Sequence, residues 1–176
     1  MSDMERRAAA VELRADGRRL EGYAAVFGER TDIADFTESV AAGAFAESLK
    51  SGRDILGLVD HDPHRLLGRV KNGTLRLAED GRGLAFSIDV PETALGSDML
   101  TLAKRGDLGG ASFGFRVPKG GDRWEGRNRT LLRVDLFDVS VVVAFPAYAS
   151  TSVSARDLQH RRLPLALARR YLDTLA

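Results

Sequence analysis

The stretch GGASFGF, residues 109–115, contains the spacing Gly110-x-Ser112-x-Gly114, which surrounds the nucleophilic serine of many hydrolases. In α/β-hydrolases that serine stands on a sharp turn between a strand and a helix, and an acid and then a histidine follow it. Here Gly114 is followed by FRVP, residues 115–118, which predicts a strand that continues and then breaks. We therefore exclude the α/β-hydrolase arrangement and treat Ser112 as a strand residue.

Strand geometry places Ser112 on a face of the strand that carries small side chains. Side chains alternate along a strand, so Phe113 and Phe115 share one face while Ser112 and Gly114 share the other. The aromatic face indicates core, and the glycine leaves room for another backbone to approach. Ser112 is then either a nucleophile or a small residue that fits a tight contact within the sheet. A serine nucleophile needs a base at neutral pH, ordinarily a histidine.

The chain offers three histidines as that base. His160 lies in a polar C-terminal tail, and His64 follows Pro63 in what reads as an exposed turn. His61 follows an apolar strand expected over residues 54–60, which favours a fixed, half-buried imidazole. His61 is therefore the best candidate base. The alternative is a histidine that merely caps the end of the strand.

Asp138 is the candidate for a third group that orients the imidazole. It lies in an apolar strand expected over residues 131–144, where a carboxylate is costly unless it is paired or hydrogen-bonded. A histidine N–H would satisfy it, and Ser140 on the same face could help. The alternatives are a solvated face or an arginine partner. Asp60 and Asp62 point to the opposite side of their strand and are poorer candidates.

Turn signals and periodicity predict the elements that must position these residues. We expect strands over residues 8–15, 19–27, 54–60, 68–70 onward, 73–79, 83–90, 111–117 and 131–144, and helices over 43–50 and 94–105. Gly106 is placed to end the second helix. Pro63 should interrupt the hydrogen-bond ladder that the strand over residues 54–60 begins. Loops are expected around Phe36 and Glu38 and over 118–130. This pattern predicts a mostly β (α+β) fold, a small antiparallel β-barrel with a few flanking helices.

Composition narrows the function classes. The chain has 176 residues, net charge +1 and no cysteine, so disulfides, thiol catalysis and cysteine zinc sites are excluded. The charge gives no reason to expect nucleic acid or an anionic membrane as partner. With only two histidines close together, a metal-dependent hydrolase has few ligands, and we expect no metal and no cofactor. No stretch approaches the ~20 apolar residues of a membrane span, so we expect a soluble, intracellular protein.

Several blocks of sequence occur together in an order that points to one family. They are FTE and GAF in the first third, HD and LGR around residues 61–69, GDL and SFGF around 106–115, and DVSVV and PAY around 138–148. From about Leu20 to Arg156 the chain resembles the prohead (procapsid maturation) serine proteases of tailed bacteriophages. The resemblance fits a protease domain over residues 1–156 and a basic, partly helical C-terminal tail over residues 157–176.

The resemblance implies a herpesvirus-assemblin-like fold and assigns roles by motif. His61 becomes the general base and Ser112 the nucleophile. Asp138 becomes the third member, at a position where the herpesvirus branch has histidine and the phage branch commonly has glutamate, which is one methylene longer.

The resemblance also implies a serine endopeptidase of capsid maturation. Its partner would be the major capsid protein, whose scaffolding segment it cleaves, and it would also cleave itself. It would act inside the assembling procapsid, in the host bacterial cytoplasm. Dimerisation is known in the herpesvirus branch, so a homodimer is allowed here. The alternative is a catalytically inactive capsid-assembly or scaffold protein on the same fold.

Overall fold

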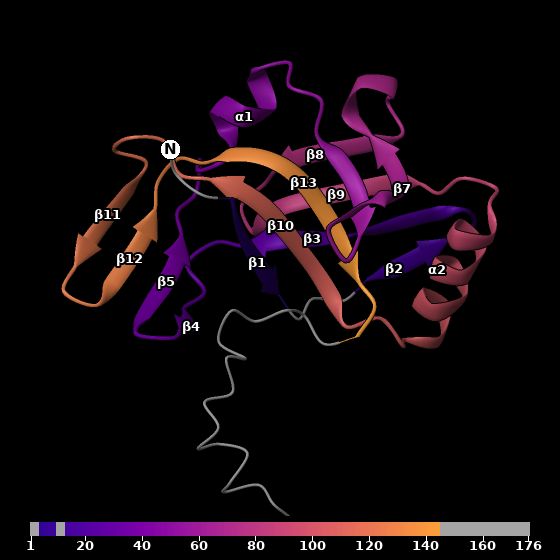
Figure 1. Ribbon diagram of the computed structural model, residues 1–176, viewed down its shortest axis with the longest axis horizontal. Helices are drawn as coiled ribbons and strands as arrows, with labels where there is room; N and C mark the ends of the chain where they lie inside the picture. Colours follow the sequence, from indigo (N-terminus) through magenta and orange to yellow (C-terminus); the bar gives the residue numbers. More distant parts are fainter. Residues whose placement is uncertain (1–3, 10–12, 145–176) are drawn as a thin grey trace, which may run out of the picture.

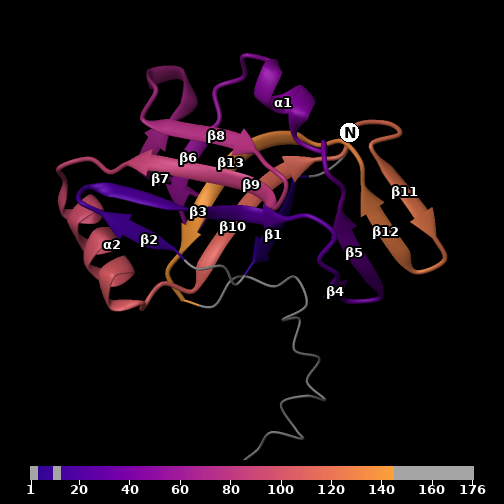
Figure 2. The same ribbon diagram turned by 180° about the vertical axis from the view of Figure 1, so that it is seen from behind.

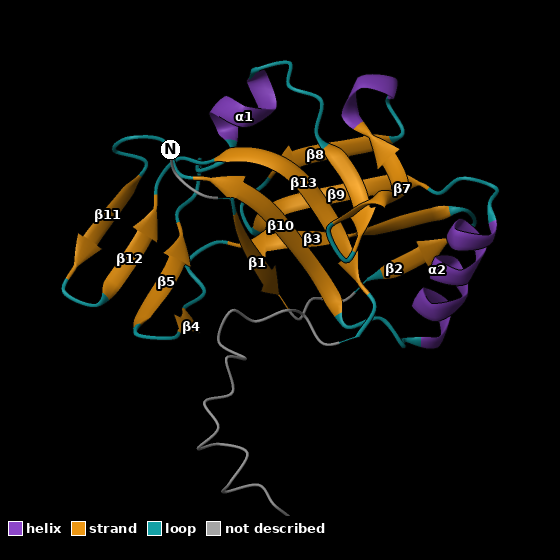
Figure 3. Ribbon diagram, in the orientation of Figure 1, coloured by secondary structure: helices purple, strands orange, loops and turns teal. Residues whose placement is uncertain are grey.

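The computed structural model describes residues 4–9 and 13–144 of the chain. Strands make up most of this part (Figure 3). The strands are β1 (Glu5–Ala9), β2 (Arg14–Asp16), β3 (Arg19–Val26), β4 (Thr31–Ile33), β5 (Phe36–Val40), β6 (Leu56–Val59), β7 (Asp62–Arg69), β8 (Leu75–Glu79), β9 (Gly83–Asp89), β10 (Gly110–Arg116), β11 (Asp122–Glu125), β12 (Asn128–Leu131) and β13 (Asp135–Val142). The helices are α1 (Ala46–Lys50), α2 (Ala94–Arg105) and a single 3-10 turn, η1 (Val70–Asn72).

The described strands form three open sheets. One has the order β1-β10-β13-β6-β7, the second β2-β3-β9-β8, and the third β11-β12-β5-β4. Most neighbours are antiparallel, but β13 with β6 and β12 with β5 are parallel. The prediction of a mostly β fold is confirmed. The closed barrel is not confirmed, because the described ladders leave every sheet with two edges.

The hydrophobic core fills the space between the first two sheets. The five-stranded sheet lies in front of β2-β3-β9-β8 in Figure 1 and behind it in Figure 2, with its strands crossing those of the other sheet. One cluster of buried side chains joins both sheets, including Leu20, Leu84, Ile88, Phe113, Leu136 and Val139. Burying each such side chain stabilises the fold by ~2 kcal/mol. This packing sets the two long strands β10 and β13 rigidly beside each other.

Helix α2 has the bounds that the sequence predicts, 94–105. The Thr93 hydroxyl accepts a hydrogen bond from the Gly96 N–H at 3.1 Å, which caps the first turn. Met99 and Ala103 are buried on one face, and Gly106 ends the helix with a φ of 75°. In the part of the chain that the structure describes, no helix is long and apolar enough to cross a membrane.

Three other expectations about elements are wrong. The single strand over 8–15 is instead two strands, β1 and β2, which belong to different sheets. Phe36 and Glu38 lie in strand β5 rather than in a loop, and residues 118–130 contain β11 and the start of β12. These strands carry many polar side chains and little alternation, so the sequence pattern missed them. Pairing with their neighbours, rather than intrinsic preference, makes them strands.

Pro63 interrupts its ladder, as expected. It lies within β7, the edge strand of its sheet, but the register with β6 shifts between the pairs Leu58–Leu66 and Val59–Asp62, so residues 63–65 pair with no residue of β6. The basic tail expected over 157–176 lies outside the described residues, as does the boundary at 156.

Candidate active site

The polar residues of the site, Ser112, Asp138, Ser140 and His61, come from two neighbouring strands of one sheet and from the turn that follows a third. Ser112 lies on β10 and is paired with Ser140 on β13, while Gly114 is paired with Asp138. Strand β13 in turn runs parallel to β6, which leads directly to His61. In Figure 1 these strands lie side by side across the front of the molecule. The sheet register therefore brings together residues that are up to 79 positions apart in sequence.

A hydrogen-bonded trio links Ser112, His61 and Asp138. His61 Nε2 lies 2.6 Å from Ser112 Oγ, and His61 Nδ1 lies 2.6 Å from Asp138 Oδ1. All three side chains are buried, with residue exposures of 1% for Ser112 and 8% for each of the other two. A buried carboxylate facing Nδ1 favours the tautomer that carries its hydrogen there. Nε2 is then left as the acceptor that faces the serine hydroxyl.

His61 occupies a tight turn rather than the end of a strand. Val59 on β6 pairs with Asp62 on β7, so Asp60 and His61 are the two central residues of the hairpin, with φ of 52° and 58°. Positive φ at both central positions is the mark of the type I′ hairpin turn. Asp60 supports this turn, because its carboxylate accepts hydrogen bonds from the Val143 N–H at 3.0 Å and Arg65 at 2.8 Å. The turn aims the imidazole back at β10 and β13.

Ser140 holds two members of the trio together. Its hydroxyl donates to Asp138 Oδ1 at 2.8 Å and accepts from the backbone N–H of His61 at 3.1 Å. The sequence suggested the contact with Asp138, because both residues share a strand face. It gave no signal for the contact with the His61 backbone, which depends on how β6 and β13 pair. Ser140 therefore fixes the turn and the carboxylate with one hydroxyl.

Gly114 has a specific reason to be glycine. A Cβ at this position would lie 2.1 Å from Asp138 Oδ2. From the sequence, the face of β10 with small side chains was expected to admit another backbone, but the space is filled by the Asp138 carboxylate. The missing side chain is what lets a carboxylate on the neighbouring strand reach His61.

The remaining candidates lie apart from this trio. His64 is exposed on β7, and its backbone N–H donates to the Asp62 carboxylate at 2.8 Å. His160 lies outside the described residues. Asp60 and Asp62 are engaged in the turn rather than with the imidazole, in keeping with their rejection as partners.

A second polar cluster, which the sequence pattern did not predict, lies between β1 and the sheet β11-β12-β5-β4. It consists of Glu5, Arg7, Glu38, Asp122 and Arg129, and it is referred to below as the acidic–basic cluster. Glu38 and Arg129 are buried in it. One signal was in the sequence, the FTE block that contains Glu38, but its partners come from strands that the pattern did not predict.

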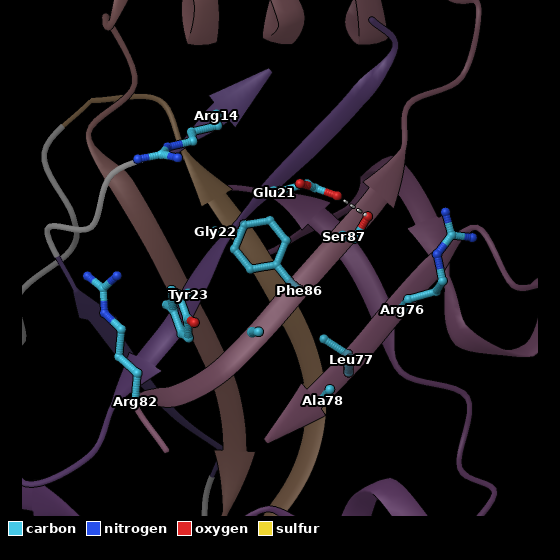
Figure 4. Close-up of a pocket in the computed structure, with 11 residues that line it drawn as sticks. Arg14, Glu21, Gly22, Tyr23, Arg76, Leu77, Ala78, Arg82, Phe86 and Ser87 are labelled. Carbon is cyan, nitrogen blue, oxygen red and sulfur yellow. Dashed lines mark hydrogen bonds between the residues drawn. The ribbon is translucent and has the colours of Figure 1, made fainter. Parts of the chain in front are cut away.

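A surface hollow lies away from both the hydrogen-bonded trio and the acidic–basic cluster. It has a volume of about 460 Å³ and lies on the β2-β3-β9-β8 sheet, where Tyr23, Phe86 and Leu77 are surrounded by Arg14, Arg76 and Arg82 (Figure 4). No member of the trio lines it. The hollow lies on the surface of this sheet, and the serine, histidine and aspartate that could carry out acyl transfer do not line it.

The trio is the arrangement used for acyl transfer by serine hydrolases, with a hydroxyl, an imidazole and a carboxylate in sequence. A model of the caudovirus prohead serine proteases matches residues 3–164 of the chain. The chain belongs to this family. The resemblance stated from the sequence blocks is thus confirmed. No curated protein and no solved structure shows significant similarity to the chain.

Membership in the prohead protease family makes the chain a member of a group of serine peptidases that act in phage capsid maturation. The region that matches contains every described strand, so the trio and the acidic–basic cluster both lie within it. The aspartate at position 138 reaches Nδ1 at 2.6 Å without the additional methylene of a glutamate.

Proposed function

We propose that this prohead protease is a serine endopeptidase in which Ser112 is the nucleophile, His61 the general base and Asp138 the residue that orients His61. The observation that carries the proposal is the unbroken chain of contacts, 2.6 Å on each side of the imidazole. Burial supports it, because these contacts are stronger where water is excluded. A strand serine with no chemical role would not need a buried imidazole and a buried carboxylate behind it.

The chemistry follows from the positions of the protons. Ser112 Oγ forms a bond to the carbonyl carbon of the peptide while its proton passes to His61 Nε2. That proton is then delivered to the leaving nitrogen as the carbon–nitrogen bond breaks, which frees an amine and leaves an ester on Ser112. Water, deprotonated by His61, releases the acid and restores the hydroxyl. Asp138 stabilises the imidazolium that forms in each half of the cycle.

The substrate that fits this role is the scaffolding segment of the major capsid protein, together with the protease chain itself. Prohead proteases act inside the procapsid, so the enzyme and its substrate are confined in one shell within the host cytoplasm. Confinement raises the effective concentration of both, and a modest intrinsic affinity is then sufficient.

Co-expression with the capsid protein of the same source tests the proposal. The wild-type chain should shorten the capsid protein, as measured by intact-protein mass spectrometry. Ser112→Ala should leave it at full length while remaining folded by circular dichroism. Ser97→Ala, an exposed serine of α2, is the matched control and should process normally.

Normal processing by Ser112→Ala would overturn the assignment of the nucleophile. A wild-type chain that folds, joins the procapsid and cleaves nothing would instead favour the inactive assembly protein. A serine-reactive phosphonate provides a second measurement, because it should add its mass to the wild-type chain and not to Ser112→Ala.

A further inference from the structure

Strand β1 covers the edge of β10 that would otherwise be open. It is the last strand of its sheet and pairs antiparallel with β10 from Glu5 opposite Phe115 to Ala9 opposite Ala111. Removing it would expose the backbone donors and acceptors of the strand that carries Ser112. An exposed strand edge of this kind is a common docking site for an extended peptide. In this structure residues 5–9 of the chain occupy the edge of β10 beside Ser112, in the way that an added peptide strand would.

The occupant presents a peptide carbonyl to the serine. The Arg7 carbonyl oxygen lies 2.8 Å from Ser112 Oγ. A hydroxyl has one hydrogen, so this carbonyl competes for it with His61 Nε2, which lies 2.6 Å away. In a substrate the serine oxygen attacks the carbonyl carbon of the residue just before the cleaved bond, whereas here the hydroxyl donates to the Arg7 carbonyl oxygen. Arg7 is therefore the residue of β1 whose carbonyl lies beside the nucleophile, hydrogen-bonded through its oxygen rather than placed for attack.

The Arg7 side chain is held by a buried carboxylate. Its Nε and Nη2 donate to the two oxygens of Glu38 at 2.5 and 3.0 Å, in the two-pronged geometry that suits arginine. Glu38 is 3% exposed, and the guanidinium also lies 5.4 Å from the centre of the Phe115 ring. A carboxylate buried to this degree is costly without a cation beside it.

Glu5, two positions before Arg7, is held by an ion pair with Arg129. Glu5 receives two hydrogen bonds from Arg129, at 2.7 and 3.1 Å. Arg129 is itself anchored by Asp122 at 2.9 Å and by Glu38 at 3.0 Å. Glu5 and Arg7 are two positions apart on one strand, so their side chains lie on the same face of the sheet. The Arg129 guanidinium also lies 5.6 Å from the centre of the Trp124 ring, on the neighbouring strand β11.

Without β1, the rest of the acidic–basic cluster would carry a net negative charge and would favour binding of a cationic side chain. Glu38, Asp122 and Arg129 would be left as two carboxylates to one guanidinium. A basic side chain that enters beside Glu38 restores the balance, whereas an apolar or acidic one leaves a buried charge without its partner.

We propose that Glu38 is the residue that determines specificity in this prohead protease, and that the enzyme cleaves peptides after arginine or lysine. Arg129 adds a preference for an acidic residue two positions before the basic one. Segment 5–9 occupies the site as a tethered peptide of this kind. This inference depends on the proposed function for the position of the cleaved bond.

Peptides with the sequence of residues 5–10, ERRAAA, test the preference directly. The acetylated, amidated peptide is compared with one that has leucine in place of the second arginine, and one that has leucine in place of the glutamate. Mass spectrometry identifies the cleaved bond and gives kcat/KM. We expect cleavage after the second arginine, a loss of about 10- to 100-fold for its replacement, and a smaller loss for the glutamate replacement. Equal rates for the arginine and leucine peptides would overturn the proposal.

Variants of the full chain test the tethered strand. Arg7→Ala should loosen β1 and raise kcat/KM for the added peptide by about tenfold, mostly through KM. Arg6→Ala, which removes the same charge from the exposed neighbouring residue, is the matched control and should match the wild type. Glu38→Gln, if it remains folded, should lose the preference for arginine. Equal behaviour of Arg7→Ala and Arg6→Ala would show that β1 does not compete for the site.

A binding measurement separates this inference from the proposed function. The Arg7→Ala/Ser112→Ala double variant, which cannot turn over the peptide, is titrated into fluorescein-labelled ERRAAA and its leucine counterpart, and anisotropy is followed. Binding at least about tenfold tighter for the arginine peptide supports the site even if no substrate is ever cleaved. Cleavage of the capsid protein at bonds with no basic residue before them would leave the proposed function intact and overturn this inference.

Discussion

At the scale of single residues, the site depends on one buried carboxylate and how it is satisfied. Asp138 lies in a strand that is otherwise apolar, and it accepts from His61 Nδ1 at 2.6 Å and from the Ser140 hydroxyl at 2.8 Å. Each donor removes part of the cost of burying the charge. The contact with Asp138 also orients the imidazole, and the Ser140 hydroxyl also accepts from the backbone N–H of His61 in the turn. The same hydrogen bonds therefore stabilise the buried carboxylate and position His61.

Asp138→Asn should reduce kcat/KM by about 10²- to 10⁴-fold and leave the fold intact, because a neutral amide does not favour the imidazole tautomer that accepts the serine proton. The loss should be smaller than that of His61→Ala, which removes the base itself. Peptide cleavage kinetics measure both. Wild-type activity in Asp138→Asn would remove Asp138 from the mechanism.

Gly114→Ala tests whether the bare position serves the carboxylate. The new Cβ would approach Asp138 Oδ2 to 2.1 Å, so the carboxylate must move away from His61. Misplacement on the order of 1 Å in such a site costs about a hundredfold in kcat/KM. Gly81→Ala is the control, because a Cβ there meets nothing within 4 Å. Full activity of both variants would show that the contact does not constrain the trio.

At the scale of elements, strand β1 differs from its neighbours in what holds it. It is five residues long and lies at an edge, and two charged side chains anchor it to other strands. Burial alone would raise the pKa of Glu5, but hydrogen bonds and charge from Arg129, together with Arg7, outweigh burial and hold that pKa below its ordinary value of 4.5. The docking of β1 is therefore linked to pH.

Because the pKa of Glu5 is lowered when β1 is docked, docking should be stronger at neutral pH than at acidic pH. Glu5 contributes stability above pH 4.5, and that contribution is lost as the pH falls through the lower pKa of the docked strand. The charged groups that face Glu5 are Arg7 on its own strand and Arg129 on β12, with Glu38 and Asp122 behind them. NMR amide shifts of residues 5–9, followed from pH 7 to pH 3, should show the strand loosening only below pH 4.5. An apparent pKa at or above 4.5 would contradict the docking geometry.

At the scale of the whole molecule, one aromatic cluster ties the site's strands to the rest of the core. The Phe45 ring, beside α1, packs edge-on against Phe113 at 5.2 Å between ring centres, and Phe113 stacks on Phe115 at 5.0 Å. Phe27 adds a stacked contact with Phe45 at 6.4 Å. Ser112 and Gly114 alternate with these rings on β10, so the packing of one face fixes the position of the other.

Phe45→Ala should destabilise the protein by about 3–5 kcal/mol, because it leaves a cavity where a fully buried ring was. That is a large part of the total stability of a typical domain. Urea unfolding followed by circular dichroism measures the change. Leu66→Ala, at an exposed position on β7, is the control and should change the stability much less. A loss below about 1 kcal/mol for Phe45→Ala would show that the core is not packed as described.

Part of this structure could be predicted from the sequence because the signal is local. Helix α2 carries its cap, its apolar spacing and its terminal glycine within 14 residues, and its bounds were predicted correctly. The alternation along β3, β9 and β10 was likewise sufficient to identify strands. By contrast, β5 and the β11–β12 pair have polar faces and no clear period, and they are strands because neighbouring strands satisfy their backbone. His61 was expected at a strand end, whereas a two-residue turn with positive φ carries it.

The sequence by itself determined the kinds of residue available for chemistry: one serine between glycines, three histidines, a carboxylate in an apolar strand, no cysteine, and the blocks that indicated the family. Those are properties of composition, order and local period. Only the tertiary structure decided that Ser112, His61 and Asp138 meet, that Gly114 makes room for a carboxylate, and that the N-terminal strand occupies the edge beside the serine. The reason is that strand pairing joins segments far apart in the chain, and its register depends on the packing of the whole core rather than on any short stretch.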